Sequence, residues 1–366
     1  MPTKRLIRWS GELSQKLGGA LRPWLPGTPP SKRGVHRIQS RLLVLGLAVL
    51  LGVAAATQTS AKTPALKPIT GAFVQLDGTN LTWTHQQWQQ ELESMRKLGM
   101  DTLIIDGVAL NEYAFCRIDS YPIWPNCGTE DPLKTLLSIS EQLDIQVWVG
   151  LYRQGWEDQT PPAFEEFARR CKTVADEFWD RYGKAAPLAG WYLLNWEIGN
   201  TAPLDNIGVK AYLDVVPYLR NLTPNLSILI SPYFTLDITP AALEEGWRTM
   251  LPAIKPDIVA LQDGVGCDRK LTPDDTGPYF QALARACKDS RVRFWGNVET
   301  FDQPAGWKTA TPDRVLRQIE TVSPHCEKVI TWEYSHYLSP LTAREGWKDL
   351  YDALAKLARE EAGPHP

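Results

Sequence analysis

Two glutamates, Glu197 and Glu299, each end an apolar stretch of sequence and each follow an asparagine by two residues. The first stretch reads LAGWYLLNWEIGN and the second reads RFWGNVETF. In a strand, side chains two residues apart share a face, so Asn195 can point the same way as Glu197, and Asn297 the same way as Glu299. A carboxylate at the end of an apolar strand costs free energy unless something pairs with it or uses it. The repeated pattern therefore indicates a site built on two carboxylates.

Hydrolysis of a glycosidic bond is a reaction that needs two carboxylates. One protonates the leaving oxygen, and the other acts as nucleophile or base. A separation of ~5–5.5 Å gives retention of anomeric configuration, and wider pairs give inversion. We expect Glu197 to be the acid/base and Glu299 to be the nucleophile of a retaining reaction.

The elements that must position these residues alternate regularly from residue 71 onward. The expected strands cover 71–77, 102–109, 145–152, 190–197, 226–234, 257–264, 292–299 and 328–335. The expected helices run from Thr84 to Gly99, 131–143, 161–182, 205–221, from Pro240, near 278–288, from Pro312, and 341–361. Strands joined by helical crossovers are parallel, and this pattern predicts an α/β fold, the (β/α)₈ or TIM barrel. An open doubly wound sheet is the alternative, but no GxGxxG follows the first strand.

Polar residues gather at the expected carboxyl ends of the strands, where barrel active sites form. The fourth and seventh strands lie nearly opposite each other in such a barrel, so Glu197 and Glu299 can face each other across its mouth. The expected substrate-binding residues are Asn195, Trp196, Tyr233, Asp263, Asn297, Trp332 and Glu333.

Each of these residues also has a structural interpretation. Either glutamate alone could form a salt bridge with a loop arginine. Asp263 precedes a glycine, as turn-forming aspartates often do, and Tyr233 could simply pack. Glu333 either pairs with Arg153 or binds substrate, and the sequence does not rank the two.

The first 61 residues differ in composition from the rest. Residues 1–41 carry nine Lys or Arg against the single acid Glu12, and 42–61 carry no charge. The apolar run 42–56 would span roughly 22 Å as a helix, short of a ~30 Å hydrocarbon core. We therefore expect a basic, largely disordered leader (1–41), an apolar signal peptide or membrane anchor (42–61), and a barrel domain (62–366).

The N-terminal pattern predicts an exported protein. Small residues precede Lys62 as at a signal-peptide cleavage site, and the positive-inside rule places residues 1–41 in the cytoplasm. The long leader keeps an uncleaved anchor open, which would attach the protein to the membrane through 42–56. A buried helix of the fold is the remaining alternative. The barrel domain would then be periplasmic or extracellular.

Composition narrows the ligands of the barrel domain. Its 30 basic and 41 acidic residues argue against nucleic-acid binding. The 15 Trp and 12 Tyr of the whole chain suit sugar rings, whose C–H faces pack on flat aromatic side chains. We expect a carbohydrate ligand.

Cysteine and histidine spacing gives no metal signature. No CxxC or HExxH occurs, and we expect neither a metal nor a cofactor. All six cysteines lie in the part expected to be exported, so disulfides are plausible. Cys116 and Cys127 flank a loop with two prolines and are the first pair we expect.

Several short segments carry a family resemblance. LGMDTLIID, VWVGLY, GWYLLNWEI, ISPYF, LQDGVG, FWGNVETF and SHYLSP occur in this order. Together they resemble a family of glycosidase-like barrels, the domain of unknown function numbered 4434, over about residues 70–340. More remotely, Glu197 and Glu299 resemble the acid/base and nucleophile of the large barrel clan of retaining glycosidases. That clan usually has Asn directly before the fourth-strand Glu, whereas here Trp196 holds that position.

The sequence therefore favours an exported glycoside hydrolase acting on a polysaccharide or oligosaccharide. A non-catalytic glycan-binding barrel, associated with polysaccharide synthesis or export, is the main alternative, because charged strand-end residues serve both. An acyl-transfer hydrolase is a third, without a visible GxSxG motif.

Overall fold

Eight parallel strands close into a barrel in the computed structural model, which describes residues 66–153, 161–185, 187–193 and 207–362. Around the barrel the order is β1-β13-β10-β9-β8-β7-β5-β2, so the first and last strands are neighbours. The predicted (β/α)₈ fold is confirmed. The barrel strands are β1 (Ile69–Val74), β2 (Thr102–Ile105), β5 (Gln146–Gly150), β7 (Leu188–Leu193), β8 (Ser227–Ile230), β9 (Ile258–Gln262), β10 (Arg293–Glu299) and β13 (Lys328–Trp332).

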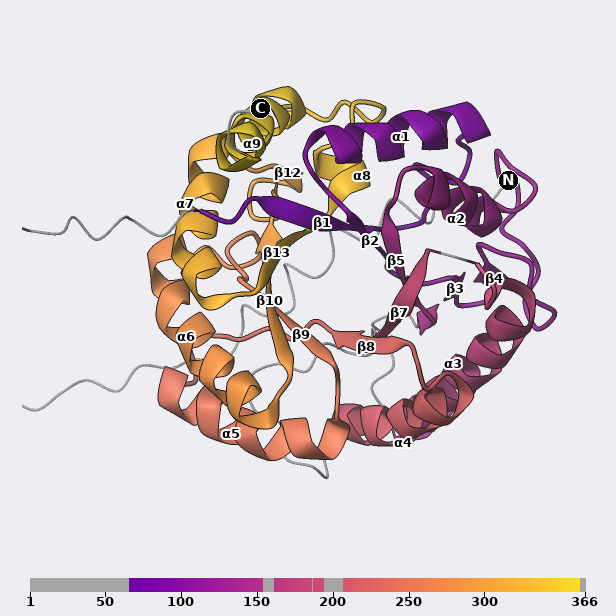
Figure 1. The fold of residues 1–366 in the computed structure, drawn as a ribbon, viewed down its shortest axis with the longest axis horizontal. Helices are drawn as coiled ribbons and strands as arrows, with labels where there is room; N and C mark the ends of the chain where they lie inside the picture. Colours follow the sequence, from indigo (N-terminus) through magenta and orange to yellow (C-terminus); the bar gives the residue numbers. More distant parts are fainter. Residues whose placement is uncertain (1–65, 154–160, 186, 194–206, 363–366) are drawn as a thin grey trace, which may run out of the picture. The chain divides into compact units, whose positions relative to one another are not determined.

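Helices surround the ring of strands (Figure 1). Local signals in the sequence start several of them. Thr84 and Gln87 form a capping box at α1, and Asp131 caps α2 with a proline at the first helical position. The helices are α1 (His85–Lys97), α2 (Pro132–Gln142), α3 (Pro161–Tyr182), α4 (Ile207–Leu222), α5 (Pro240–Ile254), α6 (Pro273–Ser290), α7 (Pro312–Val322), α8 (Tyr334–Tyr337) and α9 (Trp347–Ala362).

Small additions decorate the loops of the barrel. A three-stranded sheet forms between the loops after β2 and β5, and a two-stranded one follows β10. A short 3₁₀ helix, η3 (Ser323–His325), precedes β13. The small strands are β3 (Ala109–Leu110), β4 (Tyr113–Ala114), β6 (Tyr152–Arg153), β11 (Phe301–Asp302) and β12 (Lys308–Thr309).

Some element boundaries differ from those expected. The last barrel strand ends at Trp332, because the short helix α8 begins at Tyr334. The helix expected near 278–288 already begins at Pro273, where Thr272 and Asp275 form a capping box. The final helix begins at Trp347 rather than at 341.

The core has two parts, one inside the barrel and one between the strands and the helices. Aromatic and aliphatic side chains on alternate residues fill the inside, as Trp295 does on β10. Its members are Phe73, Ile104, Trp148, Tyr192, Leu229, Ile258, Ala260, Trp295 and Ile330. The interior is therefore packed, and a ligand must approach the barrel from one end.

The chain divides into two units, residues 1–60 and 61–366, and the described residues belong to the second. The leader and the apolar run 42–56 lie outside them, so both interpretations stay predictions. No helix among the described residues is long and apolar enough to cross a membrane.

The cysteine pairing expected from the sequence is wrong in this structure. All six cysteines are thiols. Cys116 is fully buried in the core, whereas the Cys127 thiol donates a hydrogen bond to the carbonyl of Trp124 at 3.1 Å. The loop between them is thus held by packing and hydrogen bonds.

Candidate active site at the mouth of the barrel

Glu299 ends β10 and is 2% exposed. Its Oε2 accepts hydrogen bonds from the backbone N–H groups of Gly266, at 2.6 Å, and Cys267, at 3.1 Å. The Cys267 thiol lies 3.7 Å from Oε1. Two backbone donors on one oxygen favour the ionised form of a carboxyl group. The loop between β9 and α6 therefore caps this carboxylate.

Glycine is required at position 266 of this loop. A Cβ built there would lie 2.5 Å from the carbonyl oxygen of Phe301 and 2.9 Å from Oε2 of Glu299. Any side chain would push the loop away from the carboxylate. This close approach explains why the last residue of the motif LQDGVG is a glycine.

Asn297, two residues before Glu299, is fully buried in the barrel wall. Its Nδ2 donates to Oγ of Ser231 at 3.1 Å, and Ser231 donates to the carbonyl of Ala260 at 2.8 Å. Among the described residues, the Oδ1 atom of Asn297 finds no hydrogen-bond partner. These contacts join the ends of β8, β9 and β10 just below the mouth.

Asp263 is fully buried beside Glu299. Its Oδ1 accepts from the backbone N–H groups of Val265 and Glu299, each at 3.3 Å, and its Oδ2 accepts from Nε2 of Gln318 on α7 at 2.5 Å. Burial raises the pKa of Asp263 to about 6, against the lowering effect of these donors and of Arg314. Its carboxylate faces α7, and ligand contact stays a prediction.

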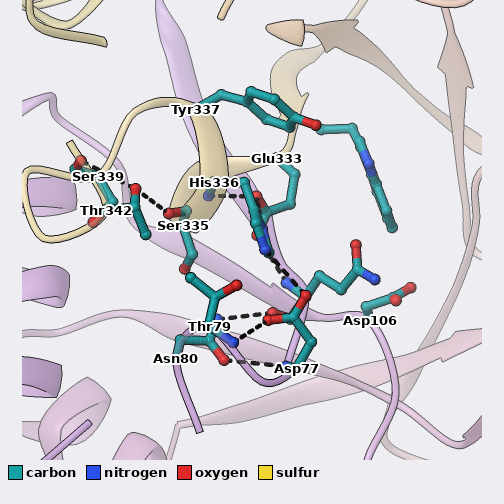
Figure 2. Close-up of polar contacts among 12 residues, drawn as sticks. Asp77, Thr79, Asn80, Asp106, Glu333, Ser335, His336, Tyr337, Ser339 and Thr342 are labelled. Atoms are coloured by element: carbon teal, nitrogen blue, oxygen red, sulfur yellow. Dashed lines mark hydrogen bonds and ion pairs between the residues drawn. The ribbon is translucent and has the colours of Figure 1, made fainter. Parts of the chain in front are cut away.

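A second group of charged residues lies where β13 and β1 end (Figure 2). The imidazole of His336 lies between two carboxylates: Nδ1 is 2.9 Å from Oε2 of Glu333, and Nε2 is 3.1 Å from Oδ2 of Asp77. Glu333 is 1% exposed, and its Oε1 accepts from the backbone N–H of Gln75 at 3.0 Å. We call Glu333, His336 and Asp77 the histidine cluster.

The histidine cluster is charged at neutral pH. Burial lowers the pKa of His336, but the charges and hydrogen bonds of Glu333 and Asp77 outweigh it and raise the pKa to about 10. The Asp77 pKa is lowered, because His336 and the N–H of Thr79 overcome the opposing effect of burial. A protonated imidazole therefore bridges two strand ends.

Among these three residues, the sequence pattern indicated a functional role for Glu333 alone. The spacing of Glu333 and His336, three apart at a helix start, was a usable signal, because such residues share a helix face. Of the two alternatives for Glu333, the pairing with Arg153 is wrong. Arg153 forms its ion pair with the buried Asp106, so Glu333 takes His336 instead.

Aromatic rings close the interior of the barrel just below the mouth. The ring of Trp332 is partly buried and lies 4.9 Å from that of Phe73, which lies 4.9 Å from that of Tyr192. Tyr233, after β8, is also partly buried. These positions suit a sugar-binding floor, which stays a prediction for both residues.

Glu197, Asn195 and Trp196 lie outside the described residues. The distance between the two glutamates, and with it the pairing, therefore remains a prediction. So does the expected absence of a metal or cofactor, although the described residues contain no group of three or more His, Cys, Asp or Glu arranged to hold a metal.

We predict that Cys267 is the fastest-reacting thiol of the native protein, because it is exposed whereas Cys116, Cys171, Cys287 and Cys326 are buried. Iodoacetamide labelling followed by peptide mass mapping should modify Cys267 first, and a Cys267→Ser variant should lose that fast phase. Uptake by a buried cysteine at the same rate would contradict the packing described above.

A family model described as a domain of unknown function, DUF4434, matches residues 69–344, most of the barrel domain. The chain belongs to this family. No curated protein matches the DUF4434 chain in sequence.

Several solved structures resemble this DUF4434 barrel, among them the following three. A candidate alpha-L-fucosidase from Bacteroides thetaiotaomicron is 21% identical, with a TM-score of 0.70, over 80% of this chain and 96% of that one. An endo-beta-1,4-mannanase from Thermotoga petrophila is 12% identical, with a TM-score of 0.56, over 82% and 79%. A family 39 glycoside hydrolase from Bacteroides cellulosilyticus is 13% identical, with a TM-score of 0.53, over 80% and 64%. At these identities the likeness establishes the (β/α)₈ barrel fold.

Proposed function

We propose that this DUF4434 barrel is an exported glycoside hydrolase that cleaves a polysaccharide or oligosaccharide with retention of anomeric configuration. The observation that supports it most is the state of Glu299. Its buried carboxylate ends a barrel strand and receives two backbone N–H groups from the neighbouring loop. A nucleophilic carboxylate must be ionised and fixed in place, and these donors favour both.

In the proposed reaction, Glu299 attacks the anomeric carbon while Glu197 protonates the departing glycosidic oxygen. The products are a free leaving alcohol and a glycosyl ester on Glu299. Glu197, now ionised, takes a proton from water as that water attacks the anomeric carbon. The glycosyl ester breaks, and the sugar leaves with its original configuration.

The surroundings assign roles to the remaining candidates. The half-buried Trp332 offers a flat apolar surface for the C–H face of a sugar ring. The carboxylate of Glu333 is hydrogen-bonded to His336 and to the backbone N–H of Gln75. Its proposed role in substrate binding is therefore indirect: it holds these two residues in place beside the sugar. Asn297 supports the wall beneath the sugar through its contact with Ser231.

A glycan-binding barrel without turnover is the second candidate. It is favoured by the engagement of both oxygens of Glu299, since Oε2 receives the loop N–H groups and Oε1 lies beside the Cys267 thiol. In that case Glu299 would serve to hold the loop rather than to attack a sugar. Both candidates bind a glycan, and turnover distinguishes them.

The test is a screen of the purified protein against defined oligosaccharides, with products identified by mass spectrometry and the anomeric configuration of the first-formed product read by proton NMR. We expect hydrolysis with retention. Inversion would overturn the retaining mechanism, and binding without hydrolysis would favour the second candidate. Export is tested separately by cell fractionation, and a soluble cytoplasmic protein would contradict it.

A further inference from the structure

Behind Glu299, on the side of α7, three side chains converge on two backbone segments. Gln318 Nε2 donates to the carbonyl oxygen of Glu299 at 3.2 Å as well as to Asp263. Arg314, from the preceding turn of α7, donates to the carbonyl oxygens of Val265, at 3.1 Å, and Glu299, at 3.3 Å. We call Asp263, Gln318 and Arg314 the bracket.

The bracket holds both polar backbone groups of two residues. Asp263 accepts the N–H groups of Val265 and Glu299, and Arg314 donates to the carbonyls of the same two residues. Val265 directly precedes the two residues whose N–H groups cap the carboxylate of Glu299. The bracket thus ties the capping loop to the backbone of the residue that it caps.

We propose that Asp263, Gln318 and Arg314 are positioning residues, which fix the capping loop against the carboxylate of Glu299. This inference rests on the proposed function, in which Glu299 is the nucleophile. The capping bond from Gly266 is 2.6 Å long, and a hydrogen bond weakens steeply with displacement. Loosening the bracket therefore lets the donors drift away from the carboxylate without touching a ligand.

Because the bracket is buried, losing one of its hydrogen bonds would destabilise the fold. Asp263 and Gln318 are both fully buried. A buried carboxylate is destabilising unless it is hydrogen-bonded, and Asp263 has three donors from protein groups. Removing the side-chain donor should thus disturb the site locally.

The test compares Gln318→Leu with the full-length wild type. Leucine keeps the approximate volume but donates to neither Asp263 nor Glu299. The titration of Glu299 is followed by carbon-13 NMR with glutamate labelled at the side-chain carboxyl, its resonance assigned from a Glu299→Gln variant. We expect the midpoint to rise by about one pH unit, because the ionised form loses donors. On any substrate found, kcat should fall about 10- to 100-fold with little change in KM.

Val322→Ala, at the end of the same helix, is the matched control. It removes buried apolar volume from α7 without touching the bracket, so it should lower the melting temperature and leave the midpoint and KM unchanged. Should Gln318→Leu fail to fold, Arg314→Lys provides a second route, since it keeps the charge but loses the forked contact with the carbonyls of Val265, Glu299 and Phe301.

The outcomes separate this inference from the proposed function. An unchanged Glu299 midpoint in a folded bracket variant would overturn the inference, whatever the activity. A raised Glu299 titration midpoint in a protein that hydrolyses no glycan would support the positioning role of the bracket and contradict the proposed hydrolase function. An equal shift of the Glu299 midpoint in Val322→Ala would contradict the inference, because the shift would then come from lost packing of α7 and not from the hydrogen bonds of the bracket.

Discussion

Replacing Glu299 with glutamine should abolish turnover of any glycan substrate while leaving the barrel folded. Glutamine has the same shape, and its amide oxygen can still accept the N–H groups of Gly266 and Cys267. It cannot form the glycosyl ester, so kcat should fall by at least about 1,000-fold. The measurement is the rate of sugar release, with circular dichroism as the check on folding.

Glu320→Gln is the matched control, because Glu320 is exposed on α7 and forms a surface ion pair with Arg317. It should keep the wild-type rate. A second experiment uses Glu299→Ala with azide, which should give a glycosyl azide of inverted configuration, because azide attacks where the nucleophile is missing. Near-wild-type hydrolysis by either Glu299 variant would remove this residue from the mechanism and make Asp263 and Glu333 the next candidates.

The second large effect is on stability. His336→Leu should strongly destabilise the barrel at neutral pH, because Glu333 is 1% exposed and its Oε2 would lose the hydrogen bond and the charge of the His336 imidazole. Breaking a buried pair by removing one partner costs about 3–5 kcal/mol. Since leucine keeps the backbone N–H, the lower half of that range is the expected loss. Urea unfolding at pH 6 measures it.

The size of this loss should depend on pH. The folded-state pKa of His336 is raised to about 10, and the unfolded value is near 6.5. A raised histidine pKa stabilises the fold fully below the unfolded value, and this contribution disappears as pH rises through the folded value. The gap between wild type and His336→Leu should therefore narrow between pH 6.5 and 10.

The exposed His85, at the start of α1, supplies the control for that experiment. His85→Leu should change the free energy of unfolding by less than about 0.5 kcal/mol at every pH tested. A His336→Leu gap that stays constant from pH 6 to pH 10 would show that the charge on the imidazole is not what holds the histidine cluster together.

Local sequence patterns were sufficient to predict the barrel. Strands and helices alternate in short units. Capping residues such as Thr84 and Gln87 are only three positions apart, so a short window of sequence is enough to predict where a helix begins. The capping box of Thr272 and Asp275 is an equally local signal, and it starts α6 before the apolar pattern that predicts a helix near 278–288. The predicted end of a strand was wrong where another element follows immediately, as α8 follows β13.

The site was predictable only in outline. That Glu299 ends a strand could be read from one segment, but its capping by Gly266 depends on a loop 33 residues away. Gln318 reads as an ordinary polar residue of an amphipathic helix, and only the packing of α7 turns it inward. Long-range contacts of this kind leave no periodic signal.

The closure of the barrel by its last strand has a consequence for how the chain folds. Ile69 of β1 pairs with Val329 of β13, and β13 also pairs with β10. Until β13 inserts, β1 and β10 each present an open row of unpaired backbone groups, the kind of edge along which chains aggregate. Pairing of such distant segments is also slow. Fragments that stop short of Lys328 should therefore be far more prone to aggregation than those that lose only α9.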